Sequence, residues 1–371
     1  MQIIDIRNLS RDEVIKLVTP IINAGGLIIY PTETTYGLGV DATNFQAIAK
    51  LLEYKTRRQG KPLSIAISGL PMAEEYVELN DQAQALYKSL LPGPVTIVSK
   101  GLGKVSAGVE SEFGTLGIRW SNYALVTQLV QTLGKPITAT SANPSGKARP
   151  YSINQLLAQL SNKQKKLVDL IIDTGPLPKH LPSTVIDTTL STPIVVRQGQ
   201  TKFASDHLLH TDSEVNTQDL AGKVMLKHWD DLSQRGLVIG LDGALGTGKT
   251  IFTKGIAKFL GINQNVTSPT YTYVHSYDFC RHGIIGQLHH ADVWKVDSAE
   301  FAEKLGLVSL MKPRSVLVIE WFNQVSKYLK PLIKNKKVKL IKVQISENKN
   351  SHQKTTQSII NNHRWFEIEE K

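Results

Sequence analysis

Residues Gly243 to Thr250, GALGTGKT, have the spacing of a phosphate-binding loop: a glycine, four residues, then glycine, lysine and threonine. The apolar run 237–241 before them predicts a buried strand, and the apolar spacing of 251–260 after them predicts a helix. Glycines let consecutive backbone N–H groups turn toward a phosphate, and the following helix adds the positive end of its dipole. This loop is therefore expected to bind ATP.

Within the phosphate-binding loop, Lys249 is predicted to reach the β- and γ-phosphates, and the hydroxyl of Thr250 is predicted to bind Mg²⁺. The position between a strand and a helix favours a nucleotide site over a mere tight turn. The predicted ATP contacts are Gly243, Gly246, Thr247, Gly248, Lys249 and Thr250.

Two carboxylates later in the chain are candidate magnesium ligands. Glu320 ends the apolar segment 315–319, so it could hold Mg²⁺ through water or orient an attacking water molecule. Asp292 ends a strand-like segment, and a helix cap or a surface carboxylate is the alternative for it. Thr250, Asp292 and Glu320 are thus the predicted magnesium residues. The histidines at 275, 282, 289 and 290 lack the spacing of a metal site.

In the first half of the chain, small hydroxyls, cations and glycines gather in three segments at predicted strand ends, where α/β folds place ligands. They are PTETTYGLG (31–39), KTRRQGKPLSI (55–65) and TSANPSG (140–146). Each segment alone also fits a strand, a solvated basic run or a turn. Their combination favours a site. The candidates are Thr32, Thr34, Thr35, Lys55, Arg57, Lys61, Thr140, Ser141 and Asn143, with Arg119, Ser183 and Arg197 at three other strand ends.

The elements that must position these residues follow from periodicity and capping. Ser10 and Glu13 form a capping box, and helical spacing continues until Gly25. Helices alternate with strands, which predicts an α/β domain with mixed strand directions. The other predicted helices are 45–54, 81–90 and 125–133, and the predicted strands are 27–30, 63–67, 95–99, 116–119, 136–140, 170–173, 184–188 and 194–197.

The length of 371 residues and the late position of the phosphate-binding loop predict two domains. The first is predicted at 1–200 and the second, a P-loop NTPase α/β domain, at 217–346. A polar linker is predicted at 201–216, and a tail of loop or disorder at 347–371. Before that tail, residues 338–345 are predicted to form an edge strand.

Composition limits the partners and the compartment. The formal net charge of +11 favours polyanions such as nucleotides or RNA, with a solvated basic surface as the alternative. The single cysteine, Cys280, permits no intramolecular disulfide and no cysteine metal cluster, which fits a reducing compartment. There is no signal peptide pattern and no apolar run long enough to span a bilayer, so a cytoplasmic protein without a membrane partner is expected.

From about Leu9 to Gly199 the chain resembles the YrdC/TsaC family of threonylcarbamoyl-adenylate synthases. The resemblance rests on the PTETTYGLG segment and on the tetrad Lys55, Arg57, Ser141 and Asn143. It implies a twisted, mostly mixed sheet around a basic cleft. It also implies a reaction that joins L-threonine, bicarbonate or CO₂, and ATP, and that releases pyrophosphate.

In the implied reaction a threonine carbamate attacks the α-phosphate without a protein nucleophile, so the site positions substrates and neutralises charge. Many members of the family have a histidine where this chain has Ala66, so one expected polar contact is missing. The tetrad members are the predicted catalytic residues. The predicted threonine and ATP contacts are Thr32, Thr34, Lys61, Arg119, Thr140, Ser183 and Arg197.

From about Thr217 to Ile345 the chain resembles TsaE, a small ATPase of the same pathway. The resemblance rests on GALGTGKT, TSPTYT, the aspartate of HHAD, and IEW. It implies an ATPase that binds the TsaD and TsaB transferase proteins, with Glu320 as a catalytic residue and Thr267 and Thr270 as switch-like residues. Relatives often carry aspartate where Ala244 stands, so one contact is absent.

Together these resemblances imply a bifunctional protein of threonylcarbamoyladenosine formation on tRNA, using ATP and Mg²⁺. One alternative is that the first domain only binds RNA, and another is that the second is a small-molecule kinase. A further alternative is a carbamoyl-adenylate synthase for another acceptor, as in hydrogenase maturation. Those proteins carry zinc-binding cysteines and an acylphosphatase segment, and a single cysteine excludes that arrangement.

Overall fold

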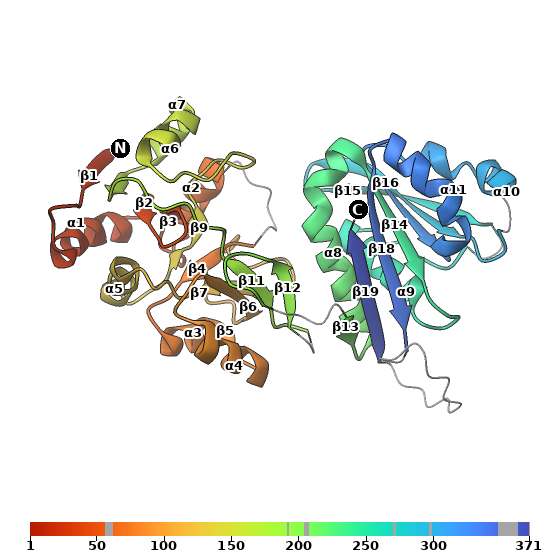
Figure 1. Ribbon diagram of the computed structural model, residues 1–371, viewed down its shortest axis with the longest axis horizontal. Coiled ribbons are helices and arrows are strands. Elements are labelled where there is room, and N and C mark those ends of the chain that lie inside the picture. The colour runs from red at the N-terminus through yellow and green to blue at the C-terminus, as the bar shows by residue number, and fades with distance from the viewer. Residues whose placement is uncertain are drawn as a thin grey trace. The chain divides into compact units, whose positions relative to one another are not determined.

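The computed structural model describes residues 1–55, 62–190, 193–203, 208–269, 272–296, 299–347 and 363–370. The chain divides into two compact units, Met1–Ser205 and Asp206–Lys371, and both are built from mixed α/β sheets (Figure 1). Within the described ranges, no helix has both the length and the apolar character needed to cross a membrane.

The first unit contains a five-stranded sheet whose middle strand is β2 (Figure 1). The pairs β1–β10 and β10–β2 are parallel, whereas β2–β3 and β3–β9 are antiparallel. The predicted mixture of strand directions is therefore confirmed. In sheet order, the strands are β1 (Gln2–Asp5), β10 (Leu170–Asp173), β2 (Ile28–Pro31), β3 (Tyr36–Gly39) and β9 (Thr140–Ser141).

A second sheet of this unit has the order β12-β11-β6-β7-β4-β8, with β5 paired to β6. It is also mixed, because β11–β6 and β4–β7 are parallel and β6–β7 is antiparallel. Its strands are β12 (Ile194–Arg197), β11 (Thr184–Asp187), β6 (Val95–Gly101), β7 (Thr115–Arg119), β4 (Ser64–Ala66), β8 (Ile137–Thr138) and β5 (Val77–Glu78).

Helices cover both faces of the first sheet, as alternation along β2 requires. Ile28 packs in the cluster formed with α1 and α5, whereas Ile29 packs in the cluster that contains Ile48 of α2. The predicted capping box at Ser10 and Glu13 is present at the start of α1. The helices are α1 (Arg11–Asn23), α2 (Phe45–Lys55), α3 (Leu70–Tyr76), α4 (Asp81–Leu90), α5 (Ala124–Leu133), α6 (Ile153–Gln159) and α7 (Asn162–Leu167).

The second unit is one seven-stranded sheet centred on β14, which lies between β17 and β18 and is parallel to both. Antiparallel strands complete the two sides. In order, the strands are β13 (Leu208–Thr211), β19 (Arg364–Glu370), β18 (Lys339–Ser346), β14 (Leu237–Asp242), β17 (Ser315–Glu320), β16 (Ile284–Asp292) and β15 (Val274–Arg281).

Helices also cover both faces of this sheet. Val238 of β14 and Leu340 of β18 pack in one cluster with α11, and a Cβ on Gly240 would lie 2.4 Å from Cγ of Phe322. On the opposite face, Phe252 of α9 packs against Phe366 of β19, with ring centroids 5.9 Å apart. The helices are α8 (Glu214–Arg235), α9 (Lys249–Leu260), α10 (Ala299–Lys304), the 3₁₀ helix η1 (Leu307–Leu310) and α11 (Phe322–Asn335).

The structure differs from the sequence expectations mainly at the borders of the second unit. The linker predicted at 201–216 contains β13 and the start of α8, and the tail predicted at 347–371 contains β19. The predicted edge strand, β18, lies inside the sheet because β19 pairs with it. The physical reason is pairing with distant segments: β13 pairs with β19 at the other end of the unit, and β19 pairs with both β13 and β18. The strand predicted at 136–140 is two short strands, β8 and β9.

Glu370, the last residue of β19, interacts with two basic side chains of α8. Oε1 of Glu370 lies 3.2 Å from Nε2 of His228 and 2.6 Å from Nζ of Lys227. These two side chains of α8 lower the pKa of Glu370 to about 2 from an ordinary value of 4.5. Because the folded pKa is depressed, the ionised carboxylate stabilises the unit fully above about pH 4.5, and this stabilisation is lost as pH falls toward 2.

We therefore expect Glu370→Gln to lower the free energy of unfolding of the second unit by about 1 to 3 kcal/mol at pH 7. Urea unfolding at several pH values would measure this difference, with hydrogen exchange of peptides from β18 reporting on this unit. The difference between the two proteins should shrink below pH 4.5. A difference that is constant down to pH 3 would contradict an electrostatic role for Glu370.

Candidate active sites

In the first unit, Lys55 lies at the end of α2 and is only 5% exposed. Its Nζ donates hydrogen bonds to the carbonyl oxygens of Ser141 and Asn143, at 2.8 and 2.7 Å. In return, Oγ of Ser145 donates to the carbonyl oxygen of Lys55 at 2.6 Å. The structure thus brings three members of the predicted tetrad together, and Lys55 fixes the backbone that carries the other two.

The segment that carries Asn143 is ordered by its own hydrogen bonds. Nδ2 of Asn143 donates to the carbonyl oxygens of Pro144 and Lys147, at 3.2 and 2.6 Å. Its Oδ1 is buried and accepts no hydrogen bond from any residue that the structure describes. A buried acceptor of this kind is costly without a donor. It therefore suits a donor group on a ligand.

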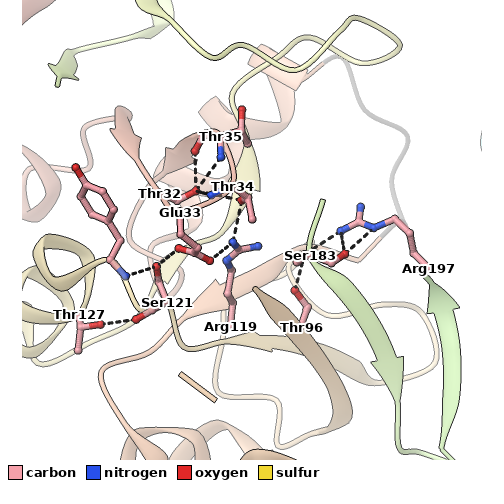
Figure 2. Close-up of polar contacts among 11 residues, drawn as sticks. Thr32, Glu33, Thr34, Thr35, Thr96, Arg119, Ser121, Thr127, Ser183 and Arg197 are labelled. Carbon is pink, nitrogen blue, oxygen red and sulfur yellow. Dashed lines mark hydrogen bonds and ion pairs between the residues drawn. The ribbon is translucent and has the colours of Figure 1, made fainter. Parts of the chain in front are cut away.

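The turn at Thr32 to Thr35 lies between β2 and β3 and is closed by one hydroxyl. Oγ1 of Thr32 accepts from the backbone N–H groups of Thr34 and Thr35, each at 3.2 Å, and donates to the carbonyl oxygen of Thr35 at 2.6 Å (Figure 2). Next to this turn, Thr140 and Ser141 pair with β3. Two predicted segments that are far apart in the sequence are therefore neighbours.

Arg119, at the end of β7, connects with this turn through an acid that the sequence reasoning missed. Its Nη2 donates to Oε1 of Glu33 and, at 2.9 Å, to Oγ1 of Thr34, and Ser121 donates to the other oxygen of Glu33 (Figure 2). Arg119 and Glu33 have side chains that are 11% and 14% exposed. Glu33 lies inside the PTETTYGLG segment, but its pairing with an arginine of another strand has no local signal.

A second polar cluster in Figure 2 joins Ser183 to Arg197. Nη2 of Arg197 donates to both the carbonyl oxygen and Oγ of Ser183, each at 2.9 Å, and Oγ of Ser183 lies 3.2 Å from Oγ1 of Thr96. Arg197 is exposed as a whole residue, but desolvation of its guanidinium by neighbouring groups, together with the charges of Arg149 and Arg119, lowers its pKa to about 10. Arg197 is therefore still a cation at neutral pH. Two other arginines of the first unit thus act on the charge of Arg197, which favours an anionic ligand beside it.

Three predicted site residues, Arg57, Lys61 and Thr270, lie outside the described residues. Thr267 is described and is exposed. Its neighbour Ser268, which the sequence reasoning did not single out as a site residue, donates from Oγ to Oδ2 of Asp292 at 2.7 Å.

In the second unit, the phosphate-binding loop has positive φ values at Gly243, Gly246 and Gly248, where glycine avoids strain. Nζ of Lys249 donates to the carbonyl oxygens of Gly243 and Ala244, at 2.9 and 2.8 Å. Burial lowers the pKa of Lys249, and the nearby carboxylates of Glu320, Asp292 and Asp242 oppose that shift.

The magnesium candidates converge at the ends of neighbouring strands. Asp292 of β16 pairs directly with Glu320 of β17, and Oγ1 of Thr250 donates to Oε1 of Glu320 at 2.9 Å. The same oxygen lies 2.8 Å from Nε2 of His290, which is fully buried and was not predicted as a site residue. A hydroxyl and two carboxylates are the oxygen donors that Mg²⁺ prefers, so these residues fit that ion.

Comparison with known families gives a separate match for each unit. Residues 20–199 match the family of Sua5, YciO and YrdC, described as "Telomere recombination". Residues 211–356 match the family described as "Threonylcarbamoyl adenosine biosynthesis protein TsaE".

Individual relatives match over about half of the chain. It is 32% identical over 198 residues to a threonylcarbamoyl-AMP synthase of Pyrococcus abyssi, covering 53% of this chain and 57% of the relative. It is 31% identical over 199 residues to a protein of Methanocaldococcus jannaschii that bears the same enzyme name, covering 54% of this chain and 92% of the relative. The chain thus spans little more than half the length of the first relative.

Among solved structures, P. abyssi Sua5 complexed with L-threonine has a TM-score of 0.51 and 22% sequence identity. The likeness covers 86% of this chain and 92% of that chain. At this identity the match shows likeness of fold alone.

The ion pair of Glu33 and Arg119 gives a stability prediction. Glu33→Gln leaves a largely buried guanidinium without a full counter-charge, so we expect the free energy of unfolding of the first unit to fall by about 1 to 4 kcal/mol. Urea unfolding, followed by hydrogen exchange of peptides from β7, would measure it. Asp5→Asn is the matched control, because the pair of Asp5 and Arg7 is exposed and should contribute little. Equal effects of the two variants would argue against a structural role for the Glu33 pair.

Proposed function

Because the chain belongs to the family of threonylcarbamoyl-AMP synthases and joins that domain to a TsaE domain, we propose that it serves threonylcarbamoyladenosine formation on tRNA with both units. The observation that carries the proposal for the first unit is the position of Lys55 between the carbonyl oxygens of Ser141 and Asn143. This arrangement fixes a buried positive charge beside polar groups that could hold a carbamate and a nucleotide.

In the proposed reaction, the amine of L-threonine combines with CO₂ from bicarbonate to give a carbamate. A carbamate oxygen then attacks the α-phosphate of ATP, the bond to the β-phosphate breaks, and pyrophosphate leaves. The unit would supply charge neutralisation and positioning. Lys55, Arg57, Ser141 and Asn143 would act at the reacting groups. The proposed further contacts to threonine and ATP are Thr32, Thr34, Lys61, Arg119, Thr140, Ser183 and Arg197.

In the second unit, the proposed activity is ATP hydrolysis that supports the TsaB and TsaD proteins. Lys249 would exchange its carbonyl partners in the loop for phosphate oxygens. Thr250, Asp292 and Glu320 would hold Mg²⁺, which neutralises phosphate charge when bound, and Glu320 would also orient the attacking water. Thr267 and Thr270 would lie near the γ-phosphate. A cytoplasmic location and direct contact with tRNA complete the proposal, and the net charge of +11 supports the latter.

Product analysis tests the two activities separately. With ATP, Mg²⁺ and bicarbonate, L-threonine should stimulate pyrophosphate release, and Lys55→Ala should lower this rate by about a hundredfold or more because the charge is lost from the reacting centre. Lys249→Ala should leave pyrophosphate release intact. Lys163→Ala removes an exposed lysine and serves as the matched control.

A wild-type protein that releases no pyrophosphate under these conditions would favour an RNA-binding role for the first unit. A phosphorylated small molecule in place of free phosphate would favour a kinase role for the second.

The joining of the two units gives a further expectation, since a tether raises the effective concentration of each unit near the other. The intact chain, mixed at nanomolar concentration with TsaB, TsaD, L-threonine and tRNA, should modify tRNA faster than separate polypeptides 1–203 and 208–371. Equal rates would show that the tether contributes nothing.

A further inference from the structure

Strand β19 brings an arginine to the phosphate-binding loop. Arg364 is the first residue of β19 and is 8% exposed. A Cβ built on Gly248 would lie 2.6 Å from Nε of Arg364 and 2.9 Å from its Cδ. The arginine side chain therefore lies directly against the backbone of Gly248, the N-cap residue of α9. A Cβ at this position would force the side chain of Arg364 to shift.

The packing of α9 on β19 explains why the arginine arrives at this end of the helix. Phe252 of α9 contacts Phe366 of β19. Gly248 precedes Phe252 by four helical residues, or about 6 Å. Arg364 precedes Phe366 by two strand residues, or about 6.6 Å, on the same face. The two distances match, so the side chain of Arg364 reaches the beginning of α9.

The charge at this position points to an anionic ligand. The N-terminal end of α9 carries the positive pole of the helix dipole, and Lys249 adds a full charge beside it. Arg364, which is 8% exposed, adds a second cation at the same pole, so the potential beside Gly248 favours an anion. A guanidinium also presents several N–H donors in a plane, which suits phosphate oxygens.

We propose that Arg364 binds a phosphate group of the nucleotide in the phosphate-binding loop, on the side of Gly248. Lys249 would bind phosphate through its Nζ, which lies at the beginning of the loop, beside Gly243 and Ala244. This inference rests on the proposed nucleotide site of the second unit. It adds to that site a residue from a part of the chain that the sequence motif does not include.

Hydrogen exchange of the full chain, titrated with MgADP, would test this proposal. Peptides within 237–260 report on the phosphate-binding loop alone, so nucleotide at the first unit does not interfere. Arg364→Met keeps an apolar stem against Gly248 but removes the charge, and it should raise the MgADP midpoint by about tenfold or more. Arg364→Lys should give an intermediate midpoint, because it keeps the charge but not the planar donors.

Arg281→Met is the matched control. Arg281 lies over the ring of Phe259, 4.4 Å from its centroid, near the opposite end of α9. Its substitution should leave the MgADP midpoint at the wild-type value. Lys249→Ala should abolish the protection and so identify the loop as its source.

Three results would overturn the inference in distinguishable ways. If wild-type peptides gain no protection from MgADP, the nucleotide site itself is wrong and the inference fails with it. If they are protected but Arg364→Met shifts the midpoint by less than twofold, the site stands and the role of Arg364 is wrong. If Arg364→Met increases exchange in β19 itself, the variant has destabilised that strand, and the comparison passes to Arg364→Lys. An unchanged MgADP midpoint in Arg364→Lys would then contradict the proposed phosphate contact.

Discussion

A positive charge that is withdrawn from water must find negative partners nearby, and this constraint organises both units. Lys55 meets the carbonyl oxygens of Ser141 and Asn143, and Lys249 meets those of Gly243 and Ala244. These carbonyl groups are dipoles, and a dipole stabilises a cation less than a full negative charge does. The carbonyl groups thus hold each lysine in position, and a bound anion would stabilise its positive charge more strongly than they do.

The positive charge of Arg119 is also withdrawn from water, but its partner is a carboxylate and not a backbone carbonyl group. Arg119 is paired with a full negative charge at Glu33, and that acid is itself held by Ser121. The carboxylate holds Nη2 of Arg119, which also donates a hydrogen bond to Thr34, whereas the buried Nε finds no hydrogen-bond partner among the described residues. The first unit therefore combines an arginine that is paired with a carboxylate and a lysine that donates to two backbone carbonyl groups.

Sequence patterns predicted the elements whose signals are local. The helix expected at 81–90 and the strand expected at 170–173 have those bounds, because a cap, a periodicity or an apolar run marks each one. The patterns missed what depends on distant partners. Glu33 gains its role from an arginine 86 residues away, and β19 exists because β18 and β13 offer it hydrogen bonds. Motif spacing suggested Lys249, and a basic segment together with a family resemblance suggested Lys55, yet the carbonyl groups that hold these lysines are visible only in three dimensions.

The pairing of β13 with β19 has a consequence for synthesis on the ribosome. Strand β13 opens the second unit, and the side chains of His210 and His363 that meet beside this pair are 153 residues apart. While a nascent chain grows, β13 has no partner until residues 364–370 have left the exit tunnel. The first unit can complete its sheets long before that moment. The two units would therefore mature in sequence, with the first folded before the second has closed its sheet.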